Sequence, residues 1–597
     1  MTVHHDGSPL YVPVGCPELG DTVPVYVRAD ASVQRLWVRT APDREPRFAA
    51  AEPVPARAPG AGERWFRAEV HLRNPVTHYR FLLDGPAGYR WLTAAGVVAH
   101  DVPDDTDFRL VCGPGAPAWA TDAVGYLVFP DRFARASTSP PVRELDLPGW
   151  AIPCDWDEPV AGAGPLRSRQ FYGGDLDGIA ERLDHVRDLG ADTLCLTPVF
   201  PAPANHRYCA SSFEEIDPLL GGDAAFGRLV EAVHRRGLRL VGDLTTNHTG
   251  DGHPWFQAAR AGADTDLYYF DDTLPDGYET WVGVRRMPKL NWASATLRER
   301  FVTAPDSVVR RWLRAGLDGW RIDVANTTGR RQAEDRTWEV AALMRQAMVA
   351  EKPDSLLIAE NAHDASTDLD RSGWHGTINY AGFTRPAWTW LATNPLPFLG
   401  LPVGVPRLPA GAMLATMGAF GARMSWQSLG NCWNGLDSHD TPRFRTLVSG
   451  DPRLVEAGVA LMMTLPGTPV VYAGDEFGLD GDWGEDARVP VPWHRPERWD
   501  AATLACYRGL IRLRRSSPAF TRGGLRILDA GPDRVSYLRE TGDEAMLVLV
   551  ARDGDGGTVR LPFGRQAENV YGGAPDLLPG RGFTVTEATV QAWRVLP

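Results

Sequence analysis

Between about residue 120 and residue 515 the chain alternates short apolar runs with amphipathic stretches, and this alternation limits the fold more than any other feature. The apolar runs have the length of buried strands, and several of the stretches between them end in glycine, as helices often do. The strand-like runs are VGYLVFP, ADTLCLTP, LRLVGDL, LDGWRIDVA, SLLIAE, TINYAGF, WNGLDSH and TPVVYAGDE. Such strand–helix units in succession favour a (β/α)8 TIM barrel over a doubly wound sheet.

The segments on either side of this region have a β-rich pattern. Residues 1–118 contain alternating apolar and polar runs separated by Pro, Gly and Asp turns, which predicts an N-terminal β-sandwich. Residues 516–597 alternate in the same way and predict a C-terminal β-sandwich. The loop at about 248–292 is longer than a connection requires, so we expect a small inserted subdomain there. The predicted class is therefore α/β, with a barrel at 119–515 between two β-domains.

Charge and cysteine content exclude several classes of partner and cofactor. A formal net charge of −13 argues against nucleic acid or an anionic membrane as the main partner, but is compatible with a neutral sugar. The start of the chain has no secretory pattern and no apolar stretch reaches the length of a membrane span, so we expect a cytoplasmic protein. The seven cysteines are scattered and form no CxxC pair, which indicates free thiols rather than a zinc site. We expect no cofactor.

Carboxylates follow four of the predicted strands. They are Asp243 in LVGDL, Asp323 in WRIDVA, Glu360 in LLIAE and Asp440 in LDSHD. A carboxylate that ends an apolar strand costs desolvation energy unless it is paired or used. One such residue alone is more often a helix cap or half of an ion pair. Four on separate strands of one barrel indicate an active site, because barrel enzymes carry theirs at the carboxyl ends of the strands.

Neighbouring residues suggest different roles for these carboxylates. Arg321 precedes Asp323 by two positions, so both side chains point to the same face of the strand, and the guanidinium is expected to favour the ionised form that a nucleophile needs. Glu360 follows an apolar run, and an apolar setting raises a carboxyl pKa as a proton donor requires. His248 and His439 are candidates for binding sugar hydroxyls, although a satisfied core histidine is the commoner case.

The strand-end segments resemble the signature segments of the α-amylase family of glycoside hydrolases, in the family's order. The four central segments are GDLTTNH (242–248), GWRIDVAN (319–326), LLIAEN (356–361) and GLDSHDTPRF (435–444). GYLVFPDRF, DTLCLTP and GTPVVYAGDEFGL resemble the motifs of the flanking strands. MPKLN (287–291) is similar to a segment typical of the branch that contains neopullulanase, cyclomaltodextrinase and maltogenic amylase. The resemblance therefore covers the whole barrel.

The resemblance implies a retaining hydrolase of α-glucosidic bonds, α-1,4 with α-1,6 as a second linkage, acting on short malto-oligosaccharides or cyclodextrins, with transglycosylation as a further reaction. It implies that Asp323 is the nucleophile, that Glu360 is the general acid and base, and that Asp440 grips sugar hydroxyls and stabilises the transition state. The implied substrate-binding residues are Tyr126, His206, Tyr208, Asp243, Asn247, His248, Lys289, Arg321, His439 and Arg443.

The chain departs from the branch pattern at positions that contact substrate and acceptor. Ala362 stands where the branch usually has Trp, Thr327 where it often has Glu, and Cys209 where it has Asp. These departures leave linkage preference open and predict a preference for short substrates. The alternatives are an α-glucosidase or a glucosyl-transferring or isomerising enzyme on the same barrel. A catalytically inactive binding subunit is disfavoured because all three catalytic carboxylates are present.

Two further expectations concern metal and assembly. Relatives often bind calcium beside the first barrel strand, but here the loop ARASTSPP (134–141) has no carboxylate or amide. Asp175 remains nearby, and one carboxylate is a poor site for a cation that prefers six to eight oxygen ligands, so we predict that no metal is bound. The branch often dimerises through its N-terminal domain, which makes a homodimer the expected assembly.

Overall fold

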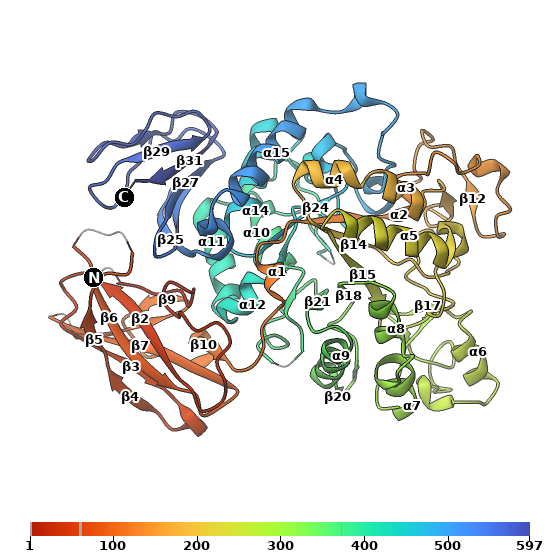
Figure 1. Ribbon diagram of the computed structural model, residues 1–597, viewed down its shortest axis with the longest axis horizontal. Coiled ribbons are helices and arrows are strands. Elements are labelled where there is room, and N and C mark those ends of the chain that lie inside the picture. Colours follow the sequence, from red (N-terminus) through yellow and green to blue (C-terminus); the bar gives the residue numbers. More distant parts are fainter. Residues whose placement is uncertain (1–2, 59–61, 87, 372, 400, 597) are drawn as a thin grey trace.

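The computed structural model describes residues 3–596 apart from 59–61, 87, 372 and 400. Its centre is a barrel of eight parallel strands, one from each of the apolar runs above (Figure 1). The strands are β11 (Gly125–Val128), β14 (Thr193–Leu196), β15 (Arg239–Thr245), β18 (Gly319–Asp323), β21 (Leu356–Ala359), β22 (Gly376–Thr377), β23 (Trp433–Asn434) and β24 (Thr468–Tyr472). The sheet order is β22-β21-β18-β15-β14-β11-β24-β23, and a parallel bridge between Ile378 and Trp433 joins its two ends. The predicted barrel is confirmed.

Helices surround the barrel because each one buries an apolar stripe against the strands. Those between the barrel strands are α2 (Pro130–Phe133), α3 (Leu176–Glu181), α4 (Leu183–Leu189), α5 (Gly222–Arg235), α6 (Pro254–Arg260), α7 (Ala295–Arg298), α8 (Val308–Arg314), α9 (Thr337–Glu351), α10 (Arg385–Leu391), α11 (Ala410–Gly421), α12 (Trp426–Gly430), α13 (Phe444–Leu447) and α14 (Pro452–Thr464). The chain enters the barrel through α1 (Ala118–Thr121) and leaves it through α15 (Ala501–Arg515) and α16 (Pro518–Arg522). Phe226 and Leu229 of α5 are buried, whereas its charged residues face outward, as its amphipathic sequence predicts.

The N-terminal region consists of two antiparallel sheets. One contains β1 (Val3–His4), β2 (Thr22–Ala29), β5 (Glu52–Val54) and β6 (Arg64–His71). The other contains β3 (Arg35–Thr40), β4 (Arg47–Ala50), β7 (Val76–Gly85), β8 (Gly88–Thr93), β9 (Gly96–Val98) and β10 (Phe108–Val111). Alternate residues of β2 and β7, including Val25 and Phe81, are buried in one shared core. The period of two in the sequence thus defines the inner faces.

The C-terminal region is a second β-structure that packs on the barrel beside α14. Its five-stranded sheet has the order β25 (Gly524–Ala530), β26 (Arg534–Glu540), β27 (Ala545–Ala551), β31 (Thr589–Val595) and β29 (Ala567–Tyr571). A smaller sheet pairs β28 (Thr558–Val559) with β30 (Phe583–Thr584). Figure 1 shows both termini on the same side of the barrel, and the ion pair between Arg28 and Glu540 joins the two β-regions there.

The long loop after β15 contains α6 and a hairpin of β16 (Thr280–Trp281) and β17 (Val284–Pro288). It returns to its starting point, because the Leu290 N–H donates to the Asn247 carbonyl at 2.9 Å and His248 forms a β-bridge with Lys289. The loop therefore places Lys289 and Trp281 beside the carboxyl end of β15.

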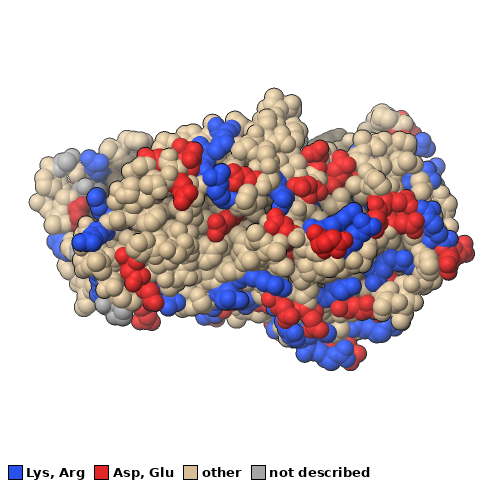
Figure 2. All heavy atoms as spheres, turned by 90° about the horizontal axis from the view of Figure 1, so that it is seen from above, with Lys and Arg blue, Asp and Glu red and all other residues tan. Residues whose placement is uncertain are grey.

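The remaining global features concern surface and thiols. Within the described ranges no helix has the length and apolar character needed to cross a membrane. All seven cysteines are free thiols. On the face shown in Figure 2, acidic and basic side chains lie in small neighbouring groups of opposite sign.

Candidate active site

Three of the four strand-end carboxylates share one guanidinium. Arg321 on β18 donates from Nη1 to the two oxygens of Asp243 at 2.8 and 2.7 Å and to Asp323 at 3.1 Å. Its Nη2 lies 2.8 Å from Oε1 of Glu360. All four side chains are buried at the carboxyl ends of the strands. The predicted same-face arrangement of Arg321 and Asp323 therefore extends to a compact cluster with three acidic groups and one cation.

Burial controls protonation in this cluster. It raises the pKa of Asp323 well above the usual carboxyl value and also raises the pKa of Glu360, and Arg321 offsets these effects only in part. It raises the pKa of Asp243 to about 6. The direction expected for Glu360 is thus found. Arg321 favours the ionised form of Asp323, as expected, but the net direction of the Asp323 pKa is up because one guanidinium does not balance three buried carboxylates.

The backbone after β18 is strained at Val324. Its φ of 38° is in the left-handed region, which a β-branched residue rarely adopts. The Val324 N–H donates to Oε2 of Glu360 at 2.8 Å, and the Ala325 N–H donates to the Glu360 carbonyl at 3.0 Å. The turn after Asp323 therefore fixes Glu360. Strain of this kind persists where surrounding structure enforces it, often at functional sites.

Asp440 lies at the opposite end of the site, with a different set of partners. His439 Nε2 is 3.1 Å from Oδ2 of Asp440 and 2.6 Å from the hydroxyl of Tyr208. That hydroxyl also donates to Asp243 at 2.8 Å, so Tyr208 links the two ends of the site. Burial lowers the pKa of His439 to about 3, which leaves the ring neutral. The Tyr208 and His439 rings stack at 5.6 Å and form one wall of the site.

The other predicted polar residues order a second wall. His206 stacks on the Tyr208 ring at 5.8 Å, and His248 Nε2 lies 3.1 Å from the Tyr208 carbonyl. Lys289 donates to Asn247 and, at 2.8 Å, to the Thr327 carbonyl. Burial lowers the pKa of Lys289 to about 8.

Two predicted pocket residues lie away from the carboxylates. Tyr126 is fully buried and donates to Glu476 at 2.6 Å on the helix side of β11, because its neighbour Leu127 takes the inward position in the barrel. Arg443 is also buried, and it donates to Asp475 at 2.6 Å and to the Ala487 carbonyl at 2.9 Å. Both therefore support the site from behind and do not line it.

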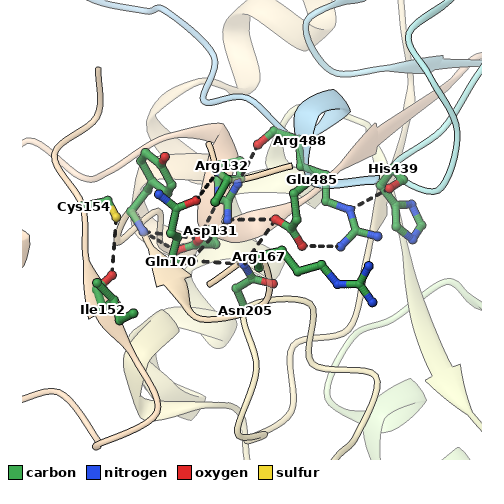
Figure 3. Close-up of polar contacts among 12 residues, drawn as sticks. Asp131, Arg132, Ile152, Cys154, Arg167, Gln170, Asn205, His439, Glu485 and Arg488 are labelled. Carbon is green, nitrogen blue, oxygen red and sulfur yellow. Dashed lines mark hydrogen bonds and ion pairs between the residues drawn. The ribbon is translucent and has the colours of Figure 1, made fainter. Parts of the chain in front are cut away.

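Arg488 is a site residue that the sequence did not reveal. It follows the 3-10 helix η9 (Gly484–Ala487), donates to the His439 carbonyl at 2.6 Å, and donates to Oδ1 of Asp440 at 3.1 Å. Figure 3 shows it between His439 and Glu485. It lies 48 positions after Asp440 in a segment without helical or strand periodicity, so no sequence signal connected the two.

The acceptor side lacks the aromatic residue that the branch usually has. Ala362 is half-buried and packs against the core. Trp374 and Trp433 are buried, with 2% and 5% of their surface exposed, so neither presents a ring to a sugar. Trp281 is half-exposed and stacks on His248 at 5.7 Å. Trp281 is therefore more exposed than Trp374 or Trp433 and is a candidate ring for contact with a sugar.

Asp175, the one carboxylate considered for a metal, has other partners. It caps α3 by accepting from the Gly178 N–H at 2.6 Å, and it accepts from the Ala136 N–H at 3.1 Å and the Ser139 hydroxyl at 2.6 Å. Across the described residues no group of three or more His, Cys, Asp or Glu side chains is arranged to hold a metal ion.

Comparisons with known proteins identify the family. The alpha-amylase catalytic-domain model matches residues 127–505. Neopullulanase 2 of Thermoactinomyces vulgaris is 32% identical, over 84% of this chain and 83% of that protein. Intracellular maltogenic amylase of Bacillus subtilis is 32% identical, over 74% and 70%. A solved cyclomaltodextrinase aligns with a TM-score of 0.74 at 26% identity and covers 99% of both chains. A cyclic alpha-maltosyl-(1→6)-maltose hydrolase from Arthrobacter globiformis aligns at 0.67 and 29%, covering 81% of this chain and all of that one.

Proposed function

The chain belongs to the α-amylase family of glycoside hydrolases, and from this premise we propose that it cleaves α-glucosidic bonds in short malto-oligosaccharides or cyclodextrins with retention of configuration. The observation that carries this proposal is the shared guanidinium. Asp323 and Glu360 bind opposite nitrogens of Arg321, and each acts on the other's pKa, so the two carboxyl groups lie close together. Retaining enzymes need a separation of about 5–5.5 Å, whereas inverting enzymes need more space for a water.

In the first step Asp323 attacks the anomeric carbon while the glycosidic bond breaks. Glu360 gives its proton to the departing oxygen, and the raised pKa of its carboxyl favours the protonated form that this step needs. The product of this step is a glycosyl ester on Asp323. The Val324 N–H and Arg321 hold the two oxygens of Glu360 in place.

In the second step Glu360, now ionised, removes a proton from water, whose oxygen attacks the anomeric carbon and releases Asp323. A sugar hydroxyl that replaces water at this point gives transglycosylation. Asp440 and His439 face the same space and would bind hydroxyls of the sugar whose ring distorts in the transition state. Proton NMR during the first minutes of maltotriose cleavage tests the mechanism. The α-anomer is expected as first product, and an initial β-anomer would refute it.

The preference for short substrates rests on the acceptor side. Ala362 supplies no ring there, and stacking of a sugar on an aromatic residue contributes on the order of 1 kcal/mol. We expect kcat/KM to be higher for maltotriose than for soluble starch. Ala362→Trp should move the ratio toward starch, with Ala365→Ser, a buried change nearby in the chain, as control. A tenfold preference of the wild type for starch would contradict this proposal.

An α-glucosidase or an isomerising enzyme is the second candidate, and it is favoured by the same departures at Ala362 and Thr327. Product analysis of maltotriose separates the candidates. An α-glucosidase releases glucose from one end step by step, whereas a maltogenic enzyme gives maltose and glucose together and an isomerising enzyme gives a new linkage. The solved hydrolase that acts on a cyclic sugar with an α-1,6 linkage makes panose and isomaltose useful additional substrates.

The proposed homodimer has a candidate surface on the N-terminal region. Phe48 and Tyr89 are 52% and 53% exposed and flank Trp91 on the outer face of the six-stranded sheet. Exposed aromatic groups of this kind mark interaction surfaces. Sedimentation velocity should show a dimer that Phe48→Ser weakens, and a monomer at all concentrations would refute the assembly.

A further inference from the structure

Asp440 is the catalytic-site carboxylate that Arg321 does not touch at hydrogen-bond distance. Among the described residues its side chain has two polar partners, His439 at 3.1 Å and Arg488 at 3.1 Å. We propose that Arg488 is the positioning residue for Asp440, and that a buried chain of alternating charges through Glu485 and Arg132 holds Arg488 in place. The proposal rests on the proposed catalytic role of Asp440.

Arg488 contacts both the side chain and the backbone of this turn. Its Nη2 donates to Oδ1 of Asp440, and its Nε donates to the carbonyl of His439 at 2.6 Å. A planar guanidinium that binds two points at once fixes direction as well as distance. Arg488 therefore determines where the Asp440 carboxylate points relative to the sugar.

The opposite edge of Arg488 is held by Glu485. Nη1 of Arg488 donates to Oε1 of Glu485 at 2.9 Å, and the other oxygen of Glu485 lies 3.2 Å from Nη2 of Arg132. Nη1 of Arg132 also donates to the Arg488 carbonyl at 2.8 Å. Arg132 thus binds Arg488 through both Glu485 and the backbone (Figure 3).

The chain of charges ends in the barrel scaffold. Nε of Arg132 donates to Oδ2 of Asp131 at 2.8 Å, and Oδ1 of Asp131 accepts from the N–H groups of Tyr172 and Gly173 at 3.1 and 3.0 Å. Asp131 and Arg132 form part of α2, which directly follows β11. The position of Asp440 is therefore coupled to the first barrel strand through side chains, although 309 positions separate it from Asp131.

Burial makes this chain effective. The exposed fractions of the side chains of Asp131, Arg132, Glu485 and Arg488 are 0%, 2%, 4% and 11%, whereas Asp440 is 28% exposed and faces the substrate space. An exposed arginine–carboxylate pair contributes little because water screens it and both side chains must be ordered. Here the cation is already ordered by its other partners. Removal of one charge would leave its neighbours buried and unpaired.

The charge pattern at Asp440 has the opposite consequence to that at Asp323. Burial raises the pKa of the Asp440 carboxyl, but its contact with His439 and the positive charges of Arg488 and Arg321 outweigh burial, so the net direction is down. Asp440 is consequently ionised while the pKa values of Asp323 and Glu360 are raised. A group that must grip hydroxyls as an acceptor is suited to this state.

Steady-state kinetics of Arg488→Gln and Glu485→Gln test the proposal, with maltotriose and an aryl α-maltoside as substrates. We expect kcat to fall about 10²-fold for Arg488→Gln and about tenfold for Glu485→Gln, with KM changed less than threefold, because misplaced catalytic groups lose rate before ground-state binding. Arg488→Lys should recover only part of the loss. The matched control is Arg495→Gln, which breaks an exposed pair with Asp157 on the same segment and should change kcat less than twofold.

A double-mutant cycle with Asp440→Asn separates positioning from general damage. If Arg488 acts through Asp440, Arg488→Gln should cost less than threefold in the Asp440→Asn background. An undiminished 10²-fold cost there, or a wild-type kcat in Arg488→Gln, would overturn the proposal. An unchanged melting temperature confirms that each variant is folded. If Arg488→Gln does not fold, Arg132→Lys replaces it in the same kinetic comparison. If Asp440→Asn alone keeps normal kcat, the proposed role of Asp440 fails instead.

Discussion

The two arginines of the active site, Arg321 and Arg488, stand at opposite ends and differ in their charge surroundings. Arg321 rises from a central barrel strand and is shared by Asp243, Asp323 and Glu360. Arg488 lies on a loop and serves Asp440, with Glu485 as its own counter-ion. At the first end negative groups exceed cations, so the pKa values of the carboxyl groups are raised. At the second end cations and carboxylates alternate, and the pKa of Asp440 is lowered so that it stays ionised.

This difference suits the chemistry of each end. Proton transfer needs groups whose pKa values have been raised toward the working pH, and an excess of buried carboxylates produces that condition. Binding of hydroxyls needs a fixed acceptor, which a paired carboxylate provides. The two arginines also differ in how they are held. The barrel strand β18 holds Arg321, whereas Arg488 lies on a loop and is held by the chain of buried charges behind it.

The largest expected effect comes from the two carboxyl groups that we propose as nucleophile and as acid and base. Asp323→Asn and Glu360→Gln should each lower kcat by about 10⁴-fold or more, since the covalent step or its proton transfer is lost. Initial-rate assays with maltotriose measure this loss. Asp335→Asn, which changes a carboxylate that is 54% exposed and paired with Arg330, is the control and should retain full activity. Near-normal turnover of Asp323→Asn or Glu360→Gln would refute the role proposed for that residue.

The next effect compares the two arginines directly. Arg321→Gln should lower kcat about 10³-fold because it removes preorganised positive charge from three groups, and thus more than Arg488→Gln, which acts on one. Parallel kinetics of the two variants, each checked for folding by circular dichroism, give the ratio. An equal or larger loss for Arg488→Gln would show that the Asp440 end carries as much of the catalysis.

The pH dependence sharpens the comparison. In the proposed mechanism activity should be lost at low pH as Asp323 is protonated and at high pH as Glu360 is deprotonated, so we expect a bell-shaped kcat/KM profile with two pKa values that belong to the coupled pair. Burial raises both pKa values, and both limbs should therefore lie above the ordinary carboxyl range of about 4. Arg321→Gln should move both limbs upward. Arg488→Gln should move only the acid limb, through Asp440, and a shift of both limbs would contradict the separation of the two ends.

A smaller effect concerns stability. Because the pKa of Asp323 is raised, the folded protein binds the Asp323 proton more tightly than the unfolded chain does. The free energy of unfolding therefore falls as pH rises from the unfolded-state pKa through the folded-state pKa. The buried charge therefore costs stability at pH 7. Asp323→Asn should raise Tm there by about 1–3 °C, and the gain should disappear as pH is lowered. Differential scanning calorimetry from pH 7 to pH 4 measures this, and a lowered Tm at pH 7 would contradict it.

The smallest expected effect is that of metal removal. Asp175 is occupied as a helix cap, so dialysis against EDTA should change kcat/KM by less than twofold. Calcium added back should likewise have no effect. Loss of activity that calcium restores would show a site that the present arrangement of side chains does not reveal.

The sequence by itself determined the barrel and the core of the site. Eight apolar runs of strand length fixed the number of strands, and their polar ends fixed where Asp243, Asp323, Glu360 and Asp440 must meet, because all parallel strands end at one face. The period of two also placed Arg321 beside Asp323. These are local properties of spacing and polarity, and they do not depend on the conformation of the loops.

Tertiary structure decided the rest. Tyr126 was misplaced because a strand pattern gives two faces but does not say which is inward when both are buried, and here Leu127 faces the barrel interior. Arg443 was misplaced because its partners, the carbonyls of Ala473 and Ala487, are backbone groups that no motif displays. Arg488 was missed because its loop has no periodicity. Its contact with Asp440 depends on long-range packing that places the residue after η9 beside the turn of His439 and Asp440, and neither segment alone encodes that packing.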